Sequence, residues 1–78
     1  MPYEIEANEQ KILLSLSGEI DLQLTPQIKM VASETMSQHP HATQFCIDAP
    51  NVSYIDSSGI AVLVFLRRQS EQNNMSFR

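Results

Sequence analysis

Cysteine, glycine, tryptophan and basic side chains are all scarce in this sequence. Its 78 residues include one cysteine, two glycines and no tryptophan, and five Lys and Arg residues stand against nine Asp and Glu residues. A single cysteine cannot form an internal disulfide, which excludes the disulfide-stapled scaffolds of small secreted proteins. The net charge of -4 argues against binding to nucleic acid or to anionic membrane surfaces, because both require a basic face.

Long apolar segments are missing as well. The longest uninterrupted apolar run, Ile60 to Leu66, is far shorter than the roughly 20 residues of a membrane-spanning helix. The N-terminal segment is acidic and lacks the basic start of a signal peptide. We therefore expect a cytoplasmic protein without membrane insertion. A chain of this length supports one domain with a small core, which favours a binding or regulatory module over an enzyme.

Apolar and polar residues alternate in two segments near the N-terminus. In Tyr3 to Ala7 the apolar positions alternate with glutamates, and the alternation resumes in Lys11 to Ser17 after a polar break. This period-two pattern is typical of half-buried strands, so the two segments predict a β-hairpin. The following segment, Gly18 to Leu24, is expected to be a connector.

A helix is predicted to begin at Thr25 and Pro26. The Thr hydroxyl can accept a hydrogen bond from a free N–H of the first turn, and proline there has no N–H to leave unpaired. The helix must end by His39, because Pro40 disfavours helical geometry in the residue before it. The predicted core-facing stripe recurs at helical spacing and comprises Ile28, Val31, Ala32, Thr35 and Met36.

The second half of the chain begins with an apolar segment, Gln44 to Asp48. Its continuous hydrophobicity suits a central strand covered on both faces. The residues Ala49-Pro50-Asn51 predict a turn, and the apolar segment Val52 to Ile55 follows it. Residues 60–66 fit either a buried strand or a helix by periodicity alone. Helix is favoured, because good N-cap residues precede this run and good helix formers follow it.

The predicted order of elements is therefore β-β-α-β-α-β. Asn73 and Asn74 would end the second helix, and Met75 to Phe77 would begin a last strand. Strands that precede and alternate with helices favour an α/β fold, with a mixed four-stranded sheet and helices packed on it. We expect residues 1–78 to form a single domain.

A pair of serines at the start of the second predicted helix is the candidate functional site. Asp56, Ser57, Ser58 and Gly59 lie between an apolar segment and the helix. Because the first turn of a helix has unpaired N–H groups and partial positive charge, a phosphate on Ser57 would be well held there. Gly59 would leave room for the backbone of a partner or for a nucleotide. Simple helix capping remains the commoner explanation of these residues.

Catalytic and metal sites have little support in the sequence. The serines do not lie in a Gly-x-Ser-x-Gly motif, and the only two imidazoles, His39 and His41, flank a proline in a predicted loop. Two histidines without a cysteine or carboxylate at ligand spacing are weak evidence for a metal site. Cys46 is interpreted as a small buried hydrophobe. We therefore predict no enzymatic activity, no metal and no cofactor.

Two blocks of the sequence resemble the STAS domains of bacterial anti-sigma factor antagonists. The first block is Leu14 to Asp21 followed by Leu24-Thr25-Pro26, and the second is Ile47-Asp48 with Val52 to Ile60. The two blocks stand at the separation found in that family and the predicted order of elements matches, so the resemblance covers nearly the whole chain. It implies the STAS fold.

The same resemblance implies a phosphorylation-controlled protein switch that regulates transcription. In such antagonists the serine after the aspartate, here Ser57, is phosphorylated by a partner kinase that is also the anti-sigma factor. The unphosphorylated protein binds that kinase and releases a sigma factor, and the charge of the phosphate should break the complex. Asp56 is expected to help position the hydroxyl and the nucleotide-metal site of the kinase, and Ser58 to cap the helix or flank the acceptor. Asp21 and, on a weaker match, Asn51 are expected near the phosphosite.

Family members normally continue for another strand and a final helix beyond the position of Arg78. On this resemblance the chain is expected to be truncated at its C-terminus. The missing elements would leave apolar surface uncovered, which predicts a homodimer or an exchange of elements between two copies.

An alternative function within the same family is a cytoplasmic STAS subunit of an ABC-type lipid transport system. There the second helix would dock on the ATPase subunit, and Ser57 need not be phosphorylated. That subclass more often has Thr-Ala where this chain has Ser57-Ser58, which favours the switch.

Overall fold

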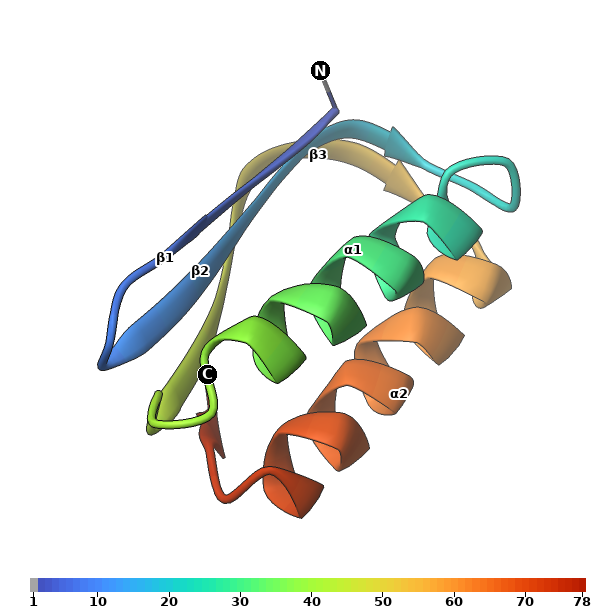
Figure 1. Cartoon of the computed structure of the whole chain (residues 1–78). Coiled ribbons are helices and arrows are strands. Elements are labelled where there is room, and N and C mark those ends of the chain that lie inside the picture. The colour runs from blue at the N-terminus through green and yellow to red at the C-terminus, as the bar shows by residue number, and fades with distance from the viewer. Residues whose placement is uncertain (1) are drawn as a thin grey trace.

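Two helices lie side by side against one face of a four-stranded sheet (Figure 1). The structure is a computed structural model and describes residues 2–78. The sheet order is β1-β2-β3-β4; β1 is antiparallel to β2, and the other two pairs are parallel. The predicted α/β fold with the order β-β-α-β-α-β is confirmed. The elements are β1 (Tyr3–Ala7), β2 (Lys11–Ile20), α1 (Thr25–Gln38), β3 (Gln44–Ile55), α2 (Ser57–Gln72) and β4 (Ser76–Phe77).

The predicted hairpin forms between β1 and β2. Asn8 closes its turn, because the side-chain Oδ1 accepts hydrogen bonds from the backbone N–H groups of Gln10 and Lys11, each at 2.8 Å. Side chains alternate between the two faces of a strand, so Ile12 and Leu14 are buried beneath the helices while Leu13 is only half-buried.

Strands β2 and β3 are both longer than the sequence predicts. The predicted connector that starts at Gly18 continues β2 as far as Ile20, and the predicted turn around Pro50 lies inside β3. Irregular pairing between the two strands accompanies both corrections. The register shifts between Ser15 and Ser17, around Pro50, and again between Gly18 and Glu19. Such a bulge accommodates an extra residue, and a proline there has no N–H that the ladder needs.

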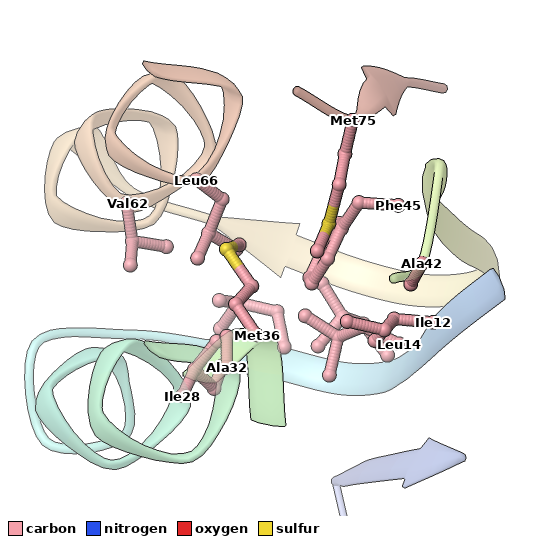
Figure 2. Packing of buried hydrophobic residues seen from close by; sticks show 12 residues of the cluster. Ile12, Leu14, Ile28, Ala32, Met36, Ala42, Phe45, Val62, Leu66 and Met75 are labelled. Atoms are coloured by element: carbon pink, nitrogen blue, oxygen red, sulfur yellow. The ribbon is translucent and has the colours of Figure 1, made fainter. Parts of the chain in front are cut away.

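The core lies between the helices and the sheet (Figure 2). Phe45 of β3 is fully buried and its ring stacks on Phe77 of β4, with ring centroids 6.1 Å apart. Leu66 of α2 and Met36 of α1 meet above the strands (Figure 2). Burial of each side chain of this size stabilises the fold by about 1.5–3 kcal/mol. The contact between these two side chains therefore helps to hold both helices on the sheet. Of the stripe predicted for α1, all residues are buried except Val31, which is half-buried.

Both helices occupy the same face of the sheet, which overturns two predictions for β3. Cys46 pairs with Leu13 on the opposite face and is half-buried. The prediction that β3 is covered on both faces is therefore wrong, as is the full burial of Cys46. The cause is that neither helix crosses to the other side, so alternate residues of β3 remain accessible (Figure 1).

Helix α1 begins at Thr25 as predicted, but Thr25 does not cap it. Its N-cap residue is Leu24, which makes no side-chain capping bond, and the buried Thr25 hydroxyl instead donates to the carbonyl oxygen of Leu22 at 3.5 Å. Asp21 orders the residues before the helix, because its Oδ1 accepts from the N–H groups of Gln23 and Leu24 at 3.1 and 3.2 Å.

The run of residues 60–66 is helical, as favoured above, and α2 ends where the asparagine pair predicts. Asn73 is the C-cap, and Asn74 adopts a left-handed conformation with φ of 61°. Asparagine tolerates this conformation better than most residues. The chain changes direction at this residue and then enters β4. Within residues 2–78, neither helix is long and apolar enough to cross a membrane.

Candidate functional site

Asp56 caps the first turn of α2 at the edge of the sheet. Its backbone is extended, with φ of -97° and ψ of -175°, so it ends β3 and starts the helix without an intervening loop. Its Oδ1 accepts two hydrogen bonds, from the Gly59 N–H at 3.0 Å and from the Ser58 hydroxyl at 2.5 Å. The capping role that the sequence assigns to this group of residues therefore belongs to Asp56, and Ser58 supports it.

These hydrogen bonds stabilise the ionised form of Asp56. The Ser58 hydroxyl is the largest cause, followed by the Gly59 N–H, and together they lower the pKa of Asp56 from its usual value of 3.8. The carboxylate is therefore charged at neutral pH. The expected role of Asp56 in positioning the acceptor hydroxyl is not what this geometry shows, since its Oδ1 holds Ser58 rather than Ser57.

Ser57 is the first residue of α2 and is exposed. Among residues 2–78, no side chain or backbone group forms a hydrogen bond with its hydroxyl. The hydroxyl therefore stands free at the N-terminus of a sixteen-residue helix, where the backbone N–H groups favour negative charge. Ser57 is neither in a strand nor sealed in the core, so it meets the geometric requirement for a phosphoacceptor.

Ser58 lines a groove between the helices. The groove has a volume of about 250 Å³ and is lined by Thr25, Pro26, Lys29, Ser58, Ala61 and Val62. Ser58 is half-buried there, and farther along the same seam the Lys29 ammonium lies 4.3 Å from the centroid of the Phe65 ring. The two adjacent serines thus face different surroundings: Ser57 faces solvent, and Ser58 faces α1.

Gly59 is required for internal packing rather than for access by a partner. A Cβ atom at this position would lie 2.5 Å from Cγ1 of Ile55 and 3.1 Å from the carbonyl oxygen of Ile20. The space left by the missing side chain is occupied by the ends of β2 and β3, and Gly59 is buried. The expectation that it leaves room for a partner's backbone or a nucleotide is therefore wrong.

The fold brings the loop of Asp21 to the site but leaves Asn51 away from it. Ile20 and Ile55 are paired in parallel, so Asp21 and Asp56 follow at the same sheet edge, and the Leu22 backbone also helps to lower the pKa of Asp56. Asn51 lies five residues before Asp56 within β3, roughly 16 Å away at the rise of a strand. It lines a different hollow, together with Glu4 and Asp48.

One face of α2 is exposed, and this was not recognised from the sequence. The face comprises Ser57, Ile60, Ala61, Val64 and Arg68. Ile60 and Val64 are 55% and 49% exposed, although the sequence places them in a run interpreted as buried. The spacing of Ser57, Ile60 and Val64, three and then four residues apart, is the available signal, because such residues share one face of a helix. Leu22, which is 69% exposed, also projects from the loop before α1.

A family model described as "Mlab, STAS domain" matches residues 4–78. The chain belongs to the STAS domain family. The STAS family membership that the sequence predicts is thereby confirmed. A comparison with curated proteins gives no significant match, and within residues 2–78 no three His, Cys, Asp or Glu residues are grouped in a way that could hold a metal ion.

Solved STAS structures share the fold of this chain. The anti-sigma factor antagonist SpoIIAA in its unphosphorylated form has a TM-score of 0.83 at 22% identity and covers 96% of this chain. The Bacillus cell fate determinant SpoIIAA in its phosphorylated form gives 0.81, 22% and 96%. An anti-sigma factor antagonist from Mycobacterium paratuberculosis gives 0.72, 22% and 96%. This chain spans 65%, 68% and 62% of those three chains, respectively.

Proposed function

We propose that this STAS domain is a protein-interaction switch that is controlled by phosphorylation of Ser57. Its partner is an anti-sigma factor that is also a serine kinase, and the unphosphorylated domain binds that partner. The observation that carries the proposal is the free, exposed hydroxyl of Ser57 at the open N-terminus of α2, beside the exposed apolar side chains of Ile60 and Val64.

The exposed face of α2 is suited to docking and to control by charge. Ile60 and Val64 offer apolar area whose burial in a complex is favourable. A phosphate on Ser57 would add about two negative charges at the start of that face, next to the ionised Asp56. Because charged groups are costly to desolvate without a partner charge, a surface that closes over unmodified Ser57 would be opposed by the phosphorylated form.

The similar structures are consistent with a local effect of the phosphate. SpoIIAA has been determined in both forms, and this chain matches them with TM-scores of 0.83 and 0.81. At 22% identity this likeness concerns the fold alone. It supports a switch in which the modification changes the charge of a docking face on an unchanged fold.

The proposal is tested by incubating the chain with ATP, Mg²⁺ and each candidate serine kinase, and locating the phosphate by mass spectrometry. We expect modification at Ser57 and its loss in Ser57→Ala, whereas the matched control Ser58→Ala is still modified. Calorimetry should show that unmodified protein binds the kinase and that modification or Ser57→Glu weakens binding at least about tenfold. Phosphate elsewhere, or equal binding by both forms, would contradict the proposal.

A second candidate function is that of a STAS subunit docked on the ATPase of a transport system. The observation that favours it is the description of the matching family model, which is not that of the anti-sigma factor antagonists among the solved structures. The same apolar side chains, Ile60 and Val64, would carry a permanent contact. Binding to a transport ATPase that Ile60→Asp abolishes, and that Ser57→Glu and kinase treatment leave unchanged, would favour this candidate over the switch.

A further inference from the structure

We infer that Asp56 is a specificity-determining residue that selects Ser57 over Ser58 as the phosphoacceptor. This inference rests on the proposed function, because it concerns how the same site is regulated. Two chemically identical hydroxyls stand next to each other in the first turn of α2, so a kinase that reads sequence alone has two candidate acceptors. The structure gives the two hydroxyls opposite surroundings.

The Ser58 hydroxyl is occupied as a donor. It donates to Oδ1 of Asp56 at 2.5 Å, which is within the short range of charge-assisted O–H···O⁻ bonds, and such bonds are about twice as strong as neutral ones. The same Oδ1 accepts from the Gly59 N–H at 3.0 Å, so the carboxylate is fixed in place by the helix that it caps. To react, Ser58 would have to give up this bond.

The position of Ser58 reinforces the effect of the bond. Its side chain faces the groove lined by Thr25, Pro26 and Lys29 of α1. A triphosphate that reached this hydroxyl would therefore lie against α1 as well as α2. Ser57 lies on the exposed face of the same helix turn, and no group among residues 2–78 holds its hydroxyl.

The reaction that is selected is an ordinary phosphoryl transfer. The Ser57 Oγ forms a bond to the γ-phosphorus of a nucleoside triphosphate, and the bond from that phosphorus to the bridging oxygen breaks, which releases the nucleoside diphosphate. The hydroxyl proton passes to a base supplied by the kinase. Asp56 takes no part in these bond changes. Its role is to keep the Ser58 hydroxyl engaged in a hydrogen bond.

Asp56→Gly and Asp56→Asn form a graded test of this role. Glycine and asparagine are both accepted at an N-cap, so α2 should persist, and circular dichroism checks this. Glycine has no acceptor for Ser58, and asparagine offers only a neutral one. Combined with Ser57→Ala, the glycine variant should be phosphorylated at Ser58 roughly ten- to a hundredfold faster than Ser57→Ala alone, with the asparagine variant in between.

Site mapping with the kinase that modifies the natural chain separates the outcomes. Rapid modification of Ser58 in Ser57→Ala alone would overturn the inference while leaving the proposed function intact. Absence of Ser58 modification in the folded double variant would overturn it too, since the kinase would then select the acceptor by its position. Loss of Ser57 modification in Asp56→Gly would also overturn it, since the kinase would then recognise Asp56 directly. Failure of every kinase to modify the natural chain would overturn the proposed function and this inference with it.

A measurement without a kinase tests the hydrogen bond itself. In a carbon-13 NMR titration, the pKa of the Asp56 carboxyl should rise toward its usual value in Ser58→Ala and stay unchanged in the matched control Ser57→Ala. An equal response to the two substitutions would show that Asp56 does not distinguish the serines, which would overturn the inference whatever the kinase does.

Discussion

Helices α1 and α2 begin in similar ways, yet their N-termini differ in what they offer to a partner. Each helix follows one of the parallel strands β2 and β3, and an aspartate stands directly after the strand in both cases. Asp21 folds its own loop, accepting from Gln23 and Leu24 before α1 starts. Asp56 is itself the N-cap of α2, which leaves Ser57 exposed at the first helical position.

The difference shows how a short connection creates an accessible site. At α1, the backbone N–H groups of Leu24 and Thr25 bond to the carbonyl oxygen of Asp21, and Thr25 is buried. At α2 no loop is present, and Gly59 lets the first turn pack directly on the strand ends, within contact distance of Ile55 and Ile20. The first turn of the helix is therefore positioned by packing, while the hydroxyl of its first residue, Ser57, is left open.

The largest effect is expected from overpacking the close contact under α2 by Gly59→Ala. The added Cβ would meet the Ile55 side chain and the Ile20 carbonyl oxygen, and only the former can move easily. Overpacking of this kind costs about 1–3 kcal/mol, against less than about 1 kcal/mol gained in helix propensity. Urea denaturation should show a lower free energy of unfolding, with partial recovery when Ile55→Ala is added. Equal stability would show that α2 does not depend on this contact.

A smaller effect is expected from opening the loop before α1 by Asp21→Ala. This substitution removes the acceptor for the Gln23 and Leu24 N–H groups, which should cost about 1 kcal/mol. Because the Asp21 carboxylate bonds to its own loop and not to Ser57, the rate of Ser57 phosphorylation should stay within about twofold. A large fall in that rate in folded protein would mean that the two helix starts act as one site.

The pH dependence of stability should distinguish Asp56 from a neutral cap. Its pKa in the folded state lies below the usual 3.8, so its stabilising contribution is present above that value and is lost as pH falls through the folded-state pKa. Below about pH 4 the natural chain should therefore lose stability more steeply than Asp56→Asn. Thermal denaturation between pH 2 and 7 measures this, and parallel profiles would contradict it.

The smallest effect is expected from Thr25→Val. The Thr25 hydroxyl makes only a long bond to the Leu22 carbonyl oxygen at 3.5 Å and does not cap α1. Unfolding free energy should therefore change by no more than about 0.5 kcal/mol, whereas loss of a true cap would cost about 1 kcal/mol. A loss of the larger size would restore the sequence-based prediction that Thr25 is the cap.

Local patterns in the sequence were enough to predict the order of the elements and the place of Ser57 among them. Alternation identified the hairpin, and N-cap residues before an apolar run correctly favoured a helix over a strand for residues 60–66. Ser57 is where the sequence places it, at the first turn of that helix. These features depend on neighbours in the chain, and local hydrogen bonding and spacing are sufficient to specify them.

The tertiary structure decided which side chains face outward and which are engaged. No local signal shows that both helices share one face of the sheet, which leaves Cys46 half-exposed, or that a bulge carries β3 through Pro50. The exposure of Ile60 and Val64 and the burial of Gly59 depend in the same way on strands distant in sequence. Sequence periodicity fixes the spacing of residues around a helix, but the direction in which that helix is rotated is set by what packs against it.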